Sequence, residues 1–359
     1  MSATRKTFWT KRLGPRSIGA VYVLVALVVI FSVISPTNFA NYGTAKLVFN
    51  QYAVTGLVGL ALLLPLSSGI YDLSVGSTAG LSGIAAAWVL ANVSANPLAG
   101  VVAGVVVAVL AGLINSAVVL GLGIDSFIGT LATGSIFIAI ATAVSGDNTI
   151  ATNVNGAFQQ DVALKNILGL TLPVFVTIAA AILLYIGLEK SGFGRRTYAI
   201  GFDVEVARLS GVRVNGIRAA GLLASATLSG IAGVLATAQI GAGSPATGPS
   251  FLLPAFAAAF LGATQFKGGR FNSWGTIVAV LLLGTGNVGL LVVGGPSWSP
   301  DVFDGVILIA AVGLTSAKGI GPLRIRSLRR QSPSAPNLKA PVDPGLSSEA
   351  EEKSAQTLA

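Results

Sequence analysis

Long apolar stretches alternate with short polar ones along almost the whole chain. Most of these stretches reach or approach the roughly 20 residues that a helix needs to cross the hydrocarbon core of a bilayer. The windows are Ile18–Ile34, Val48–Leu66, Ile70–Leu90, Leu98–Leu120, Phe127–Val144, Leu172–Leu188, Ile217–Ala238, Leu252–Thr264, Trp274–Val293 and Phe303–Ala317. The pattern predicts an all-α polytopic membrane protein with about ten transmembrane helices. The first window reads as a permanent span, because no small-residue cleavage site follows it.

Lysine and arginine are unevenly divided between the segments that join these windows. If the N-terminus is cytoplasmic, only Lys46 and Lys165 of the 22 Lys and Arg fall outside. Because positive residues gather on the cytoplasmic side, both termini are expected there. The predicted organisation is a cytoplasmic N-terminal tail (residues 1–17), a ten-helix domain (18–317) and a cytoplasmic tail (318–359). The composition of the second tail predicts disorder from about residue 332.

Composition supports a membrane protein and excludes several chemistries. Hydrophobic residues make up 53% of the 359 residues and charged residues only 10%, whereas soluble domains carry about 25% charged residues. The absence of Cys and His removes thiolate and imidazole metal ligands, the Cys nucleophile and the commonest general base. The chain also lacks the phosphate-binding motif G-x-x-x-x-G-K-[ST], so it should not hydrolyse nucleotide by itself. We expect no catalytic residue, no metal site and no cofactor.

The net charge of +9 does not indicate a nucleic-acid partner. The basic residues flank the apolar windows and fill the segments between them, which is the distribution expected beside a membrane. Membrane lipid is therefore a predicted partner, and nucleic acid is not.

A few polar residues interrupt the apolar windows and are candidates for a substrate pathway. Asp72 lies in a glycine-bearing break, where it either caps the next helix or marks a broken helix beside a hydrated path. Asn115 and Asn287 lie inside apolar windows, where they either join helices by hydrogen bonds or contact a substrate. Because polar side chains are costly against lipid, Asp72, Ser74, Asn115 and Asn287 are all expected to face the bundle interior.

The eighth window, Leu252–Thr264, is short for a membrane span. It provides about 20 Å of helix against a hydrocarbon core of about 30 Å. A Gly- and Pro-rich segment, Gly241–Pro249, precedes it. Such interrupted segments are typical of substrate paths, but ordinary loop residues before a tilted helix explain the pattern equally well.

The loop over residues 192–215 is long and contains its own helix signal. Asp203 can cap a helix of about two turns over Val204–Ser210, and Gly211 suits the position just after its end. A helix this short is marginal in water, so another element or a partner must hold it. It either lies on the membrane surface or docks a cytoplasmic partner.

The two faces of this short helix differ in character. Val206 and Leu209 share an apolar face, while Glu205 and Arg208 share a charged one. An apolar face beside a charged pair is suited to docking in a groove of another protein.

At this loop the sequence resembles the permeases of ribose-type ABC importers, the membrane subunits of bacterial monosaccharide uptake systems. Gly194–Gly201 (GRRTYAIG) followed by Glu205–Val212 (EVARLSGV) is similar to their cytoplasmic coupling loop. Asp72–Ser77 (DLSVGS) matches a family signature, and Phe127–Thr133 (FIGTLAT), preceded by a G-x-x-N word that ends at Asn115, is similar to another. A glycine-rich segment from Gly262 to Thr276 also matches, and the resemblance runs from about Asn38 to Leu314.

The resemblance implies an activity and a set of partners. The chain would be the permease subunit of an importer in the bacterial inner membrane, translocating a ribose- or xylose-like monosaccharide or a polyol. A cytoplasmic ATPase subunit would supply energy, a periplasmic or lipid-anchored sugar-binding protein would deliver the sugar, and a second permease copy or a homologous permease would complete the channel. The residues implied in coupling to the ATPase are Asp203, Glu205, Ala207, Arg208, Leu209, Ser210 and Gly211.

Departures from the family pattern leave the sugar open. Family members usually have paired prolines where Asp125–Ser126 stand, and a second glycine at Ala263. Leu253 and Gly286–Asn287 also differ from the usual residues. The alternative function is a secondary transporter driven by an ion gradient, which would need ionisable residues inside the membrane. Only Asp72 and Asp304 are candidates for that role.

Overall fold

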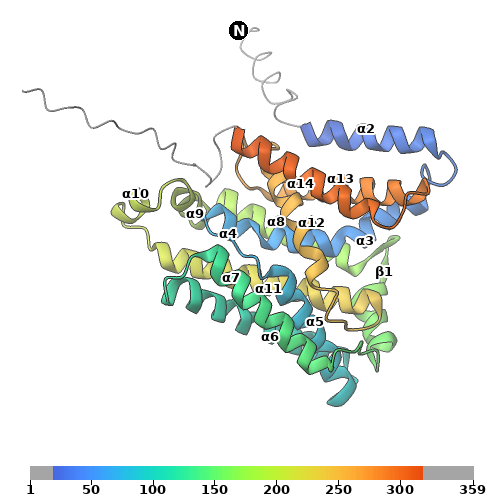
Figure 1. Cartoon of the computed structure of the whole chain (residues 1–359), viewed down its shortest axis with the longest axis horizontal. Helices are drawn as coiled ribbons and strands as arrows, with labels where there is room; N and C mark the ends of the chain where they lie inside the picture. The colour runs from blue at the N-terminus through green and yellow to red at the C-terminus, as the bar shows by residue number, and fades with distance from the viewer. Residues whose placement is uncertain (1–18, 318–359) are drawn as a thin grey trace, which may run out of the picture. The chain divides into compact units, whose positions relative to one another are not determined.

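The computed structural model describes residues 19–317, and most of this part of the chain is helical (Figure 1). Its α-helices are α2 (Gly19–Ile34), α3 (Tyr42–Ala61), α4 (Leu63–Ser67), α5 (Val75–Asn92), α6 (Pro97–Ser116), α7 (Ser126–Ser145), α8 (Leu172–Tyr185), α9 (Gly192–Phe202), α10 (Val204–Leu209), α11 (Val214–Ile240), α12 (Leu252–Ala263), α13 (Ser273–Val292) and α14 (Ser299–Ala317). π-helical turns extend α6 over Ala117–Gly121 and α8 over Ile186–Lys190. Every predicted window lies mainly in helix, so the all-α class is confirmed, but the window Ile70–Leu90 begins in a non-helical stretch before α5. The two predicted tails lie outside the described residues.

Seven helical stretches of the described chain are long and apolar enough to cross a membrane. They are Tyr42–Ser67, Val75–Asn92, Pro97–Gly121, Ser126–Ser145, Leu172–Lys190, Val214–Ile240 and Ser273–Val292. Two further apolar helices, Gly19–Ile34 and Pro249–Ala263, are shorter, and α14 has 19 residues. The chain is thus an all-α polytopic membrane protein, while the count of ten crossings stays a prediction.

Local sequence signals set many of the helix ends. Asn41 caps α3 by accepting a hydrogen bond from the Thr44 amide at 2.9 Å. Asp125 caps α7 in the same way, and Asn272 caps α13. α11 ends at Gly241, whose φ of 75° is the left-handed conformation that glycine adopts without strain. These caps satisfy backbone groups that the helices leave open.

α3 joins two groups of helices, which lie on different sides of it in Figure 1. One group contains α5, α6, α7 and α11, and the other contains α2, α12, α13 and α14. α3 contacts α11 of the first group and both α12 and α13 of the second. α12 is buried through small side chains, Ala255, Ala257, Ala258 and Ala259. Small residues let helix backbones approach closely where lipid gives no hydrophobic driving force.

Glycine allows the closest of these approaches. A Cβ atom on Gly233 of α11 would overlap the carbonyl group of Ala79 on α5. A Cβ atom on Gly262 of α12 would lie 2.5 Å from the amide nitrogen of Thr276 on α13. The glycines in these helices therefore serve packing, which explains their presence without a role in substrate contact.

The loops expected to share a side do meet at one end of the bundle, here called the α10 end. The Tyr198 hydroxyl of α9 donates a hydrogen bond to the carbonyl oxygen of Phe271, before α13, at 2.6 Å. The Lys267 ammonium lies 2.7 Å from the Glu189 carboxylate at the end of the π-helical turn after α8. The loop over residues 192–215 and the turn before α13 are thus packed together, as the charge distribution predicts.

The other end of α8 carries a small hairpin and is here called the hairpin end. Strand β1 (Asn166–Ile167) pairs antiparallel with β2 (Leu170–Thr171). The Thr171 amide donates to the Asn50 side chain of α3 at 3.0 Å, which ties the hairpin to the bundle. Leu168, at the tip, is 92% exposed. The segment before the hairpin also contributes to the core, because it buries Val154, Phe158 and Ala163.

Candidate functional site

Asp72 lies in a non-helical break between α4 and α5 and is fully buried. One carboxylate oxygen accepts hydrogen bonds from the Ser74 amide at 3.1 Å and the Ser74 hydroxyl at 2.6 Å. The other accepts from the Ser225 hydroxyl of α11 at 2.8 Å. The N-cap position of α5 belongs to Ser74 and not to Asp72. The predicted break is present, and Asp72 stabilises it by holding the residue that begins the helix.

The same cluster extends into two more helices. The Asn115 side chain of α6 donates to the Ser74 hydroxyl at 2.7 Å. The Thr133 hydroxyl of α7 donates to the Asn115 oxygen at 2.5 Å. We call these five residues, Asp72, Ser74, Asn115, Thr133 and Ser225, the Asp72 network. It joins the start of α5 to α6, α7 and α11 inside the bundle, and Thr133 and Ser225 were not predicted as members.

The backbone of the break is satisfied by hydroxyl groups of α7. The Tyr71 amide donates to the Ser126 hydroxyl at 3.1 Å, and the Leu73 amide donates to the Thr130 hydroxyl at 2.9 Å. Non-helical backbone at membrane depth is tolerated only where neighbouring groups supply such partners. The non-helical conformation of the break therefore depends on the hydroxyl groups of α7 as much as on the sequence of the break itself.

Asn287 belongs to a different contact. It lies on α13, is buried, and donates a hydrogen bond to the Asp304 carboxylate of α14 at 2.9 Å. Both asparagines thus form bonds between helices, which is one of the two roles considered for them. The four predicted pathway residues are all buried, but only Asp72, Ser74 and Asn115 come together. A role for any of them in a substrate pathway stays a prediction.

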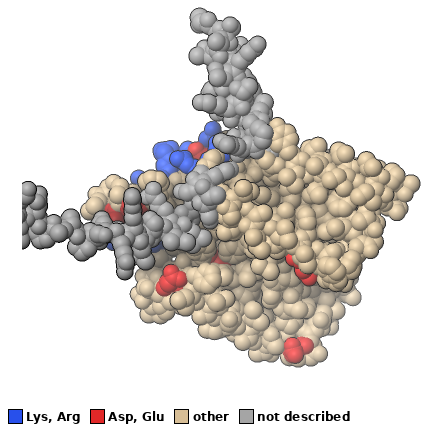
Figure 2. Space-filling model, turned by 45° about the horizontal axis from the view of Figure 1, so that its top comes forward, with Lys and Arg blue, Asp and Glu red and all other residues tan. Residues whose placement is uncertain are grey.

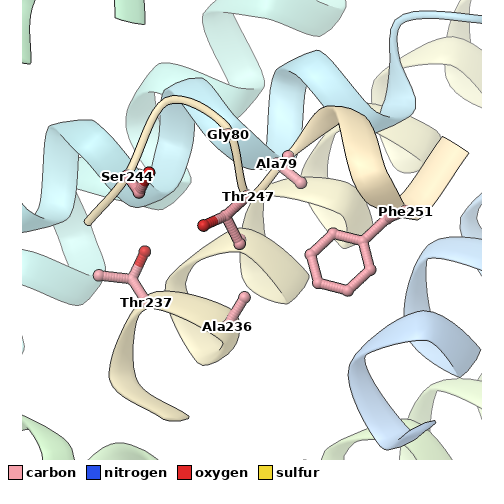
Figure 3. Close-up of a pocket in the computed structure, with 9 residues that line it drawn as sticks. Ala79, Gly80, Ala236, Thr237, Ser244, Thr247 and Phe251 are labelled. Carbon is pink, nitrogen blue, oxygen red and sulfur yellow. The ribbon is translucent and has the colours of Figure 1, made fainter. Parts of the chain in front are cut away.

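A narrow crevice lies farther along α5 than the Asp72 network, between α5, α11 and the segment that precedes α12. Figure 3 shows the hydroxyl-bearing side chains Thr237, Ser244 and Thr247 at this crevice, with Phe251 at its other side. The segment packs backbone to backbone on α5, since a Cβ atom on Gly76 would lie 2.8 Å from the carbonyl oxygen of Gly248. The Gly- and Pro-rich signal before the short α12 therefore marks a place where hydroxyl groups line a crevice between helices.

Local sequence builds α10 at the end of the bundle where the basic loops meet. The Asp203 carboxylate accepts hydrogen bonds from the amides of Glu205 at 2.9 Å and Val206 at 3.0 Å, as expected of its cap. The helix ends one residue earlier than predicted, with Ser210 as its cap. Gly211 follows with a φ of 78°, the left-handed conformation predicted for it.

α10 presents charged and apolar side chains to solvent. Arg208 and Glu205 form an exposed ion pair at 3.3 Å. Val206 and Leu209 are 59% and 81% exposed, and Phe202, the last residue of α9, is 93% exposed. We call Phe202, Val206 and Leu209 the α10 apolar tip. Phe202 was not predicted, although an aromatic residue just before a helix cap was a signal that could have found it.

The inner side of α10 explains how so short a helix holds its place. Ala207 is buried against Ile200 of α9 and against Val214 and Ile217 of α11. The loop expected over residues 192–215 is therefore mostly helical, because α9 and α11 supply the packing that α10 lacks alone. Ala207 anchors α10 to the bundle and does not face outward with its neighbours.

The comparisons with known proteins bear on what these features do. A family model described as branched-chain amino acid transport system / permease component matches residues 45–312. The ribose import permease protein RbsC of Bacillus subtilis (strain 168) is 31% identical over 304 residues, covering 84% of this chain and 94% of the relative. The D-allose transport system permease protein AlsC of Escherichia coli (strain K12) is 32% identical over 311 residues, covering 86% and 92%.

The L-arabinose transport system permease protein AraH of Escherichia coli (strain K12) is similar to the same extent. It is 32% identical over 302 residues, covering 82% of this chain and 91% of the relative. No solved structure matches the chain. The similar proteins are thus matched nearly from end to end.

Proposed function

This chain belongs to the permease family described as branched-chain amino acid transport system permease component, and from that membership we propose that it is the membrane-spanning permease subunit of an ABC importer for a monosaccharide. It is a multi-pass protein of the bacterial inner membrane. The observation that carries the proposal is the end-to-end similarity to permeases named for ribose, D-allose and L-arabinose. These relatives share a class of cargo, so a monosaccharide is the best-supported class here, and the individual sugar is left open.

The energy for import comes from a separate subunit. This chain has no G-x-x-x-x-G-K-[ST] motif, so ATP hydrolysis belongs to a cytoplasmic ATPase partner. The element best suited to receive that partner is α10, which is capped at one end, anchored by Ala207 and exposed on its outer side. The α10 apolar tip supplies surface for a groove, and the ion pair of Glu205 and Arg208 fixes the register of the contact.

The topology follows from where α10 must lie. With the α10 end in the cytoplasm, the basic residues of the loop 192–215 and of the turn before α13 face the ATPase and the inner leaflet. The hairpin end then faces the periplasm, where a periplasmic or lipid-anchored sugar-binding protein docks. We place ten helices across the membrane and both termini inside. A second permease copy, or a homologous permease, completes the channel.

The substrate path is assigned to the neighbourhood of the break before α5. The Asp72 network holds this break, and the hydroxyl-lined crevice lies along the next turns of α5. Hydroxyl groups exchange hydrogen bonds with sugar hydroxyls without requiring a charge on the cargo. We infer that Asp72, Ser74 and Asn115 hold the helices beside the path in position, and that Asn287 holds α13 against α14.

The ion-driven alternative is not favoured. A coupling carboxylate must exchange its proton or cation with the path, but the Asp72 carboxylate accepts three hydrogen bonds from Ser74 and Ser225. Asp304 is likewise engaged by Asn287.

Reconstitution tests the proposal directly. Vesicles that contain the permease and its ATPase, supplied with the binding protein, are assayed for uptake of ribose, D-allose and L-arabinose with and without ATP. We expect uptake of at least one sugar that requires ATP, the ATPase and the binding protein together. Uptake that persists without the ATPase, and that follows an imposed ion gradient, would overturn the proposal.

A further inference from the structure

A second pocket lies at the α10 end, away from the crevice and the Asp72 network. It has a volume of about 150 Å³ and is lined by Leu188, Glu189, Arg195, Tyr198, Lys267 and Arg270. Figure 2 shows Lys and Arg side chains gathered in one region of the visible surface, with a carboxylate among them, while most of the surface around them is uncharged. Two regions that are distant in sequence build this pocket: the end of the α8 stretch with the adjoining α9, and the turn before α13.

The charges in the pocket do not balance. Glu189, whose side chain is only 11% exposed, is paired with Lys267 at 2.7 Å. Arg195 and Arg270 also line the pocket and are exposed, and neither forms an ion pair with any residue of the described chain. Two guanidinium groups thus face the same small space as Glu189 without an ion-pair partner, and the pocket carries a net positive charge.

The walls of the pocket are held in place. The Tyr198 hydroxyl donates to the Phe271 carbonyl oxygen at 2.6 Å, and the Arg270 guanidinium lies 5.6 Å from the centre of the Tyr198 ring. Burial, with a smaller effect from the charge of Glu189, raises the pKa of Tyr198 to about 12. The backbone beside Arg270 is therefore fixed, and its guanidinium group lies near the Tyr198 ring before any ligand arrives.

The pocket lies where the membrane-spanning helices end. Leu188 and Glu189, which line it, are near the end of the span Leu172–Lys190. Arg270, which also lines it, comes shortly before the span Ser273–Val292. Tyr185 and Trp274, one from each span, pack with ring centres 6.2 Å apart, and Trp274 is 43% exposed. Exposed aromatic residues at helix ends are typical of the headgroup level of a bilayer. The pocket is thus at the depth where lipid phosphates lie.

We propose that this pocket binds a phosphate group, carried by the headgroup of an anionic phospholipid, between the guanidinium groups of Arg195 and Arg270. Guanidinium forks match phosphate oxygens in pairs and form strong charge-assisted hydrogen bonds. Basic pockets between membrane helices are suited to anionic headgroups. A lipid bound here contacts both α9, which carries α10, and the turn before α13. The inference goes beyond the proposed function, since it depends on the membrane location and not on the sugar or the ATPase.

Lipid binding to the purified full chain tests the inference. Detergent-solubilised protein is titrated with phosphatidylglycerol or phosphatidylcholine and examined by native mass spectrometry, and its thermal unfolding is followed with the same lipids and with inorganic phosphate. The variants are Arg195→Gln, Arg270→Gln and the double substitution. Arg196→Gln is the matched control, because Arg196 is exposed on the same helix but does not line the pocket.

The wild type is expected to bind phosphatidylglycerol more tightly than phosphatidylcholine, and each pocket substitution is expected to weaken that binding about fivefold. The control should keep it, and all variants should unfold at the wild-type temperature in phosphatidylcholine. No preference for phosphatidylglycerol, or an equal loss in Arg196→Gln, would overturn the inference. Stabilisation by inorganic phosphate that equals the lipid effect and needs Arg195 would identify a soluble phosphate as the ligand and overturn the lipid assignment. Unchanged binding of phosphatidylglycerol by the double substitution would also overturn the inference.

Discussion

The Ser225 hydroxyl of α11 donates a hydrogen bond to the Asp72 carboxylate at 2.8 Å, across 153 positions of sequence. The bond joins the break before α5 to the middle of the longest helix of the described chain. Because Asp72 also accepts from both polar groups of Ser74, a single carboxylate fixes where α5 begins and how it sits against α11. The shape of the break is therefore a property of the whole bundle.

Removal of the Asp72 carboxylate is expected to destabilise the bundle. Asp72→Ala leaves buried donors of Ser74 and Ser225 without an acceptor, which should lower the free energy of unfolding by about 3 kcal/mol. Asp72→Asn keeps one acceptor oxygen and should cost less. The unfolding temperature in detergent measures both effects, with Asp161→Ala, at an exposed carboxylate, as the control. An Asp72→Ala variant as stable as the wild type would contradict the role given to the network.

The α10 apolar tip is expected to carry much of the affinity for the ATPase. Phe202→Ser and Leu209→Ser each remove a large exposed side chain, and each should weaken ATPase binding about tenfold or more if that side chain is buried on docking. Leu168→Ser is the matched control, because Leu168 is 92% exposed at the opposite end of α8. Co-elution of the ATPase with each purified variant gives the measurement. Equal binding by all three variants would place the contact elsewhere.

The charge and the turn of α10 should affect coupling more than insertion. Arg208→Glu replaces the partner of Glu205 with a like charge, and Gly211→Val forces a branched side chain into a φ of 78°, at a cost of about 1–2 kcal/mol. Both variants should reach the membrane but lose most of the ATP hydrolysis that depends on transport. Gly123→Val imposes the same strain at a φ of 70°, with open space around it, and should couple normally. Wild-type ATPase binding and uptake by both α10 variants would show that this helix is not the coupling element.

The contact between Gly248 and α5 is expected to set the width of the crevice. A Cβ atom added at Gly248 would overlap the backbone of Gly76 and Gly80, so Gly248→Ala should push the segment before α12 away from α5. Sugar uptake should fall severalfold while ATPase binding is unchanged. Gly305→Ala, where an added Cβ meets nothing within 4 Å, should transport like the wild type. An unaltered rate and KM for uptake in Gly248→Ala would remove this crevice from the substrate path.

Hydropathy determined the helices of this protein, for a simple physical reason. Backbone groups in lipid must form their hydrogen bonds within the segment, so the apolar stretches became mainly helix. The exception is the start of the window Ile70–Leu90, where hydroxyl groups of α7 satisfy the backbone instead. Short-range chemistry was equally readable. Asp203 caps α10 and Gly211 follows it in the left-handed conformation because both features depend on a few adjacent residues.

The sequence also indicated which residues could not face lipid, but it could not pair them. Asp72, Ser74, Asn115 and Asn287 are all buried, since a polar group in hydrocarbon is costly. That cost says nothing about which partner satisfies the group. The hydroxyl of Ser225 is one of many along the chain, and Asn287 bonds to Asp304 and not to the others.

Tertiary structure alone decided the contacts between distant segments. Ala207 turns inward and Leu209 outward because α9 and α11 pack on one side of α10 only. Arg195 and Arg270 face one pocket because the Tyr198 hydroxyl bonds to the backbone beside Arg270. Hydropathy and capping act over a few residues, whereas these placements depend on which helix surfaces fit together across the bundle, and no single stretch of sequence contains that information.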